Sequence, residues 1–218
     1  MSNKHLEPRT VGFLFVGGLA TAGTTVGMLG ATSATTYASG GNGGVTTGIF
    51  LALMLFTAGV AALWTNQMAA KWGNQKVYAS AQVGVAVSWI FVGVFEAVTD
   101  SSLVVLLLAA PIFGIMIGVT GVLIPFIARS FVDTGSLTAS LARRSAVSGI
   151  AAILGAVIGG YLIRATDPGI GIVANGLLTL PLAIFVICIR PVAALKPVRA
   201  HSSPMRDIFS RLRNNSRL

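Results

Sequence analysis

Six long apolar stretches, separated by short polar ones, decide what this chain can fold into. A helix needs about 20 apolar residues to cross the roughly 30 Å hydrocarbon layer of a bilayer, and several stretches reach that length without a charged residue. The sequence therefore predicts an all-α membrane protein with six transmembrane helices. The expected spans cover about residues 11–36, 46–65, 77–98, 103–127, 146–163 and 169–189.

Composition agrees with a membrane protein and argues against catalytic or metal chemistry. Only 10% of the 218 residues are charged and 54% are hydrophobic, whereas a soluble domain carries about 25% charged residues. The single Cys188 excludes an intramolecular disulfide and a cysteine metal cluster. His5 and His201 lie outside the apolar stretches. We therefore expect no enzyme, no metal and no cofactor.

The basic residues predict the orientation in the membrane. Lys and Arg accumulate in cytoplasmic loops, and with six spans all 15 of them except Arg164 fall on one side. This distribution explains the net charge of +9 better than nucleic acid binding does. We expect a multi-pass protein of a bacterial inner membrane, with both termini in the cytoplasm.

The end of the chain differs from the expected six-helix bundle of residues 1–190. The tail, residues 191–218, contains a segment, 204–213, in which apolar residues recur at helical spacing opposite basic ones, after Ser203 as a potential N-cap. This pattern predicts an amphipathic helix on the anionic lipids of the inner leaflet, although a solvated terminus is the alternative. Its defining residues are Arg206, Phe209, Arg211, Leu212 and Arg213.

A few polar residues inside the spans are candidates for a solute pathway. Thr21, Thr25 and Thr32 share one stripe of the first span; such hydroxyls either bond their own helix or line a polar path. Glu96 either contacts solute or a coupling ion, or anchors at the interface and pairs with Arg164. The candidate pathway comprises Thr21, Thr25, Thr32, Glu96 and Asn175. The abundant glycines of the spans are expected to permit close helix packing.

The polar stretch Asn66–Lys76, expected to be a loop, carries a family resemblance. It resembles the signature loop between spans two and three of the major facilitator superfamily, with Lys71 and Lys76 at basic positions and Gly73 at the turn. Ala70 stands where the family has Asp. Gly114–Gly118 and the Gly-rich run 149–160 are similar to the family's motifs in spans four and five, and Arg143-Arg144 also suits it.

The resemblance implies one half of a transporter, because such proteins have two six-helix halves, each built from two three-helix repeats. It further implies alternating access for a small, amphipathic or apolar solute, and a homodimer or a partner half. The cytoplasmic gate would comprise Lys71, Gly73, Lys76 and Asp133. The alternative is a non-transporting accessory or assembly subunit of a larger membrane complex that retains this fold.

Overall fold

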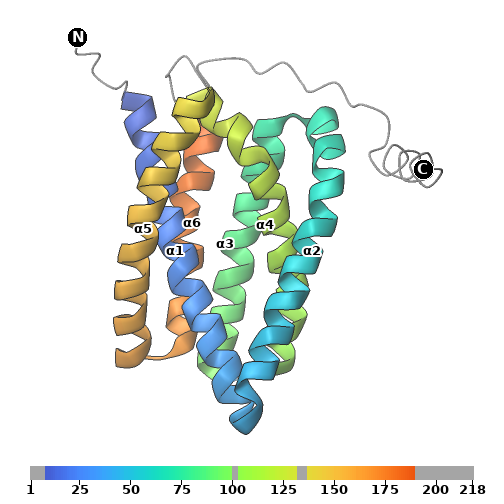
Figure 1. Cartoon of the computed structure of the whole chain (residues 1–218), viewed down its shortest axis with the longest axis vertical. Helices are drawn as coiled ribbons and strands as arrows, with labels where there is room; N and C mark the ends of the chain where they lie inside the picture. The colour runs from blue at the N-terminus through green and yellow to red at the C-terminus, as the bar shows by residue number, and fades with distance from the viewer. Residues whose placement is uncertain (1–7, 100–102, 132–136, 190–218) are drawn as a thin grey trace, which may run out of the picture.

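The structure is a bundle of six antiparallel helices, each long and apolar enough to cross a membrane (Figure 1). The computed structural model describes residues 8–99, 103–131 and 137–189. Within this part the helices are α1 (Pro8–Ala38), α2 (Gly43–Trp72), α3 (Asn74–Thr99), α4 (Leu103–Phe131), α5 (Leu137–Ala165) and α6 (Pro168–Cys188), with a 3₁₀ turn at Gly40–Asn42. The expected all-α fold with six helices long and apolar enough to span a membrane is thus confirmed for the described residues.

The largest difference from expectation concerns the stretch Asn66–Lys76, which is almost entirely helical. Helix α2 continues through its polar end to Trp72, and α3 begins at Asn74. Only Gly73 interrupts them, with φ +89° and ψ 141°. Its N–H still donates to Ala69 O at 2.8 Å. Polar side chains do not end a helix that reaches water, whereas a positive φ does, and glycine adopts that conformation without a Cβ clash.

Two other helix ends are explained by local chemistry. Gly40 has φ +56° and lies open to solvent in the turn between α1 and α2, where no atom stands within 4 Å of a Cβ built on it. At the start of α6, Asp167 is the N-cap, and its Oδ1 accepts a hydrogen bond from Gly169 N at 2.7 Å. Pro168 occupies the first helical position, where its missing N–H costs nothing.

Helix pairs distant in sequence make the main interfaces. Helix α1 packs along α6 and α5, α4 packs along α2 and α3, and α3 packs along α6. Glycines bring these backbones together. A Cβ on Gly155 would stand 2.6 Å from Ala22 O, and one on Gly176 would stand 2.5 Å from Ala86 O. Because lipid offers no hydrophobic drive between helices, such close packing is the main source of association.

Aromatic and aliphatic side chains fill two clusters inside the bundle. Near the α2–α3 junction, Phe13 stacks on Phe131 with ring centroids 5.3 Å apart. Toward the opposite end, Trp89 stacks on Phe113 at 3.9 Å and an interplanar angle of 1°. Both Trp89 and Phe113 are fully buried. The first contact joins α1 to α4, and the second joins α3 to α4.

Candidate functional site

The threonine stripe of α1 is mainly engaged with its own helix. Thr25 donates to Thr21 O at 3.1 Å, and Thr32 donates to Met28 O at 2.8 Å. Thr21 donates to Gly17 O at 2.9 Å and also lies 3.3 Å from Ser148 Oγ on α5. Among the three, Thr21 is therefore the residue for which the structure records a side-chain bond to another helix.

Asn175 lies in the seam between α1 and α6. Its side chain is completely buried and packs against Gly27, where a Cβ would stand 2.6 Å from Asn175 Nδ2. Oδ1 accepts a hydrogen bond from Thr179 Oγ1 at 3.1 Å. Nδ2 is buried and has no hydrogen-bond partner among the described residues. The side chain of Asn175 therefore bonds within α6, as that of Thr32 bonds within α1.

Glu96 is buried rather than exposed at the end of its helix. Only 3% of its surface is accessible, although Thr99, one turn later, is exposed. Arg164, which was considered as a possible partner, is exposed near the end of α5. A carboxylate held inside the bundle is a stronger functional candidate than an interfacial one.

A second group of polar residues was not recognised from the sequence as a site. We define the α1–α3–α5 polar cluster as Thr21, Tyr78, Gln82, Arg144 and Ser148. Gln82 Nε2 donates to the buried Tyr78 hydroxyl at 3.0 Å. The Arg144 guanidinium lies 5.8 Å from the centroid of the Phe13 ring, and its charge acts on the Tyr78 hydroxyl.

Arg144 gives this cluster its chemical character. One guanidinium nitrogen, Nη1, is buried without a hydrogen-bond partner among the described residues. Nη1 lies near Gly17 of α1, because a Cβ built there would stand 3.8 Å from it, an ordinary contact distance. The cluster combines a cation, three hydroxyls that can donate or accept, and an amide. The available signal was Tyr78 and Gln82, spaced by one helical turn inside an apolar span.

The expected gate residues lie at the α2–α3 junction. Lys71 lies in the last turn of α2. Its ammonium is 5.6 Å from the centroid of the Trp72 ring, a distance typical of a cation–π contact. Gly73 makes the break, and Lys76 lies in the first turn of α3. Asp133 lies outside the described residues, as does the expected amphipathic helix 204–213 with Arg206, Phe209, Arg211, Leu212 and Arg213.

Comparison of the chain with family models, with curated proteins and with solved structures finds no match. The functional assignment therefore depends on the geometry of the bundle and on the residues above.

Proposed function

We propose that this chain is one half of a membrane transporter of the major facilitator type. It moves a small, amphipathic or apolar solute by alternating access, and it works as a homodimer or with a second six-helix half. In this proposal the α2–α3 junction and both termini face the cytoplasm of a bacterium, because six of the seven basic residues in the described helices lie at that end, all except Arg164.

The observation that carries the proposal is the symmetry of helix pairing. Exchanging α1 with α4, α2 with α5 and α3 with α6 converts each main interface into another one. The α1–α5 interface becomes α4–α2, α1–α6 becomes α4–α3, and α3–α6 becomes itself. Such an exchange is expected when two three-helix repeats are related by a pseudo-two-fold axis. The sequence resemblance in spans two, four and five supports the same interpretation.

The exposed helices offer a surface for the second half. Helices α5 and α2 lie at the two edges of the bundle (Figure 1), and in their apolar windows only 11% and 22% of the residues are buried. Several small residues on them are open: a Cβ on Gly48, Gly59, Gly149 or Gly160 would meet no atom within 4 Å. Since small residues serve close helix contacts in lipid, we infer that α2 of one half packs against α5 of the other.

The polar cluster is the best candidate for solute contact within such a pair. A solute with a partial negative charge or a hydrogen-bond acceptor would interact with Arg144 Nη1, and its apolar part with Phe13. The described spans contain one acid, Glu96, so that the described residues offer little for a proton relay. Facilitated diffusion or exchange of the solute is the mode that these groups support best.

The pairing is tested by cysteine cross-linking in membranes. Cys188→Ser removes the one cysteine of the chain. Ala52→Cys on α2 and Ala156→Cys on α5 are then introduced in separate copies, since both positions are exposed and lie equally many residues from the helix ends at Gly43 and Ala165. We expect a cross-linked dimer when the two variants are co-expressed.

The matched control places the cysteines on α3 and α6 instead of α2 and α5. Phe91 on α3 and Leu177 on α6 are also exposed and lie at a similar depth, eight and nine residues from the helix ends at Thr99 and Pro168, but the proposal places them toward lipid. Phe91→Cys and Leu177→Cys should give no dimer. Equal cross-linking of both pairs would contradict the proposed interface, and one large partner copurifying in constant ratio would favour the accessory subunit instead.

Transport itself is tested with proteoliposomes that contain a panel of fluorescent amphipathic dyes. Arg144→Gln keeps hydrogen-bonding capacity but removes the charge, and we expect the rate for a transported dye to fall about tenfold, equivalent to a lost interaction of about 1.4 kcal/mol. Arg143→Gln, at an exposed neighbouring position, should leave the rate unchanged. Equal rates for both variants would remove Arg144 from the pathway, and no dye movement by the unmodified protein without a cross-link would reject transport of this solute class.

A further inference from the structure

Two adjoining pockets lie beside the α2–α3 junction and form one groove, which we call the α2–α3–α4 groove. The pocket nearer the junction has a volume of about 360 Å³ and is lined by Lys71, Trp72, Lys76, Val77 and Ser80. The deeper pocket, of about 390 Å³, shares Val77 and Ser80 with the first. It is otherwise lined by apolar residues of the three helices: Val60, Ala61, Trp64, Met68, Ala81, Ile115, Met116 and Val119.

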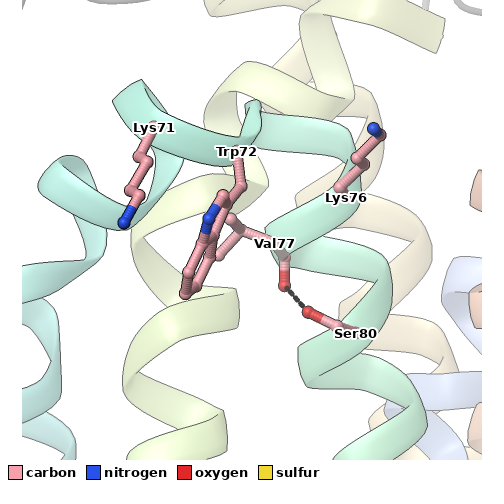
Figure 2. A pocket seen from close by; sticks show the side chains of 5 residues that line it. All are labelled: Lys71, Trp72, Lys76, Val77 and Ser80. Carbon is pink, nitrogen blue, oxygen red and sulfur yellow. Dashed lines mark hydrogen bonds between the residues drawn. The ribbon is translucent and has the colours of Figure 1, made fainter.

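The groove changes from basic to apolar along its length. Figure 2 shows the Lys71 side chain and the Trp72 ring pointing along the groove from the end of α2, while the Lys76 ammonium points toward the end of the bundle. The deeper part is lined mostly by apolar side chains, among them those of Met68 and Met116. An occupant that matches both parts is an amphiphile with an anionic head and an apolar chain.

The groove opens sideways, on the face that meets the bilayer. Trp64, Met68 and Ile115 line it and are 49%, 36% and 43% exposed. Trp64 and Trp72 lie near the basic end, where tryptophans of membrane proteins mark the headgroup level. An occupant can therefore enter from the hydrocarbon layer with its head at the level of Lys71.

The size of the groove suits a small molecule or a thin chain. Both pocket volumes fall in the range of about 300–1,000 Å³ that is typical of small-molecule sites. An acyl chain fits this shape, because it is thin and flexible.

We propose that the α2–α3–α4 groove binds an anionic phospholipid from the leaflet on the Lys71 side. One acyl chain occupies the part lined by Trp64, Met68 and Met116, and the phosphate lies beside the Lys71 ammonium group, with Lys76 adding positive charge at the end of the bundle. The proposal is independent of the transport function: it requires only that the six helices span the membrane.

Native mass spectrometry of the full chain in detergent tests the proposal. The protein is titrated with a phosphatidylglycerol and with a phosphatidylcholine that carry identical acyl chains. We expect the phosphatidylglycerol to bind at least fivefold more tightly. Lys71→Ala with Lys76→Ala should abolish this preference, because a basic residue near an anionic surface changes affinity about fivefold.

Matched controls separate the groove from general surface charge. Arg9→Ala with Arg143→Ala removes the same charge from exposed positions near the same end of the bundle and should preserve the preference. Ser80→Phe fills the part common to both pockets and should weaken binding of both lipids, whereas Val87→Phe, at an exposed position of α3 outside the groove, should not.

Two results would overturn the proposal. One is that the unmodified protein binds both lipids equally, and the other is that the two double variants lose the preference for phosphatidylglycerol to the same extent. Glycerol phosphate without acyl chains distinguishes a lipid from a soluble anion. We expect no displacement of phosphatidylglycerol by it, and displacement at comparable concentration would identify a soluble-anion site instead.

Discussion

The close approach of α2 and α4 leads to a quantitative prediction about Gly118. In the structure a Cβ on Gly118 would stand 2.9 Å from Ala58 Cα and closer still to the Ala58 carbonyl oxygen. Gly121, in the next turn of the same helix, has no atom within 4 Å of such a Cβ. The two glycines therefore form a matched pair, in which the same substitution to Ala either clashes or does not.

The magnitude follows from the contact distances. Carbon atoms pack at about 3.5–4.0 Å, so Gly118→Ala must displace α2 from α4 by at least about 0.6 Å. The contact partner is backbone, which cannot rotate away. Overpacking of this kind costs about 1–3 kcal/mol, and we expect that loss in the free energy of unfolding. Gly121→Ala should change stability little or raise it slightly, because Ala favours the helix by up to about 1 kcal/mol relative to Gly.

The assay is equilibrium unfolding with dodecyl sulfate in mixed micelles, followed by far-ultraviolet circular dichroism and tryptophan fluorescence. Fluorescence is informative because Trp89 on α3 stacks on Phe113 of α4, so that a shift of α4 changes the ring environment. Gly118→Ala should unfold at lower dodecyl sulfate than Gly121→Ala. Equal midpoints for the two variants would refute the inference that backbone contact holds α2 and α4 together.

Four further substitutions test local features with the same unfolding experiment, followed by circular dichroism. Gly73→Ala should destabilise the protein by about 1–3 kcal/mol, because its φ of +89° is unfavourable for a residue with a Cβ; an unchanged midpoint would show that the junction rearranges without cost. Trp89→Ala should cost about 3 kcal/mol, because it removes a fully buried ring that stacks on Phe113. We expect a larger loss than for Gly118→Ala, and a smaller one would contradict this expectation. Thr21→Val should cost about 0.6 kcal/mol through the lost contact with Ser148, whereas Thr25→Val should be neutral because Thr25 bonds only a carbonyl of its own helix; identical losses would count against an α1–α5 bond.

The number and approximate position of the helices could be predicted because the hydrocarbon layer imposes a length on every span. Helix ends were harder to place. The prediction of a polar loop over residues 66–76 was wrong: Gln67 to Trp72 are compatible with a helix, and a helix can continue beyond the hydrocarbon into water. Gly73 alone carried the signal for the break, through its ability to adopt a positive φ.

The role of individual glycines could be predicted only as a group. Gly114, Gly118 and Gly121 were all expected to serve packing. In the structure the first two contact α2, whereas no atom stands within 4 Å of a Cβ built on Gly121. The sequence does not contain this distinction, because it depends on which helix becomes the neighbour. The same reason explains why Arg144 was assigned to a motif but not to a polar cluster: its neighbours Phe13 and Tyr78 lie on α1 and α3.

The pairing of α1 with α6 has a consequence for how the protein is made. Helix α1 leaves the ribosome before the other five helices, yet one of its largest interfaces is with the last helix of the bundle. Until α6 is inserted, Gly23, Gly27 and Gly30 of α1 have no partner at the positions that contact α6. Helix α6 must therefore be synthesised before α1 can complete its packing. A nascent chain that stops earlier leaves the α6-contacting face of α1 uncovered and accessible to membrane proteases.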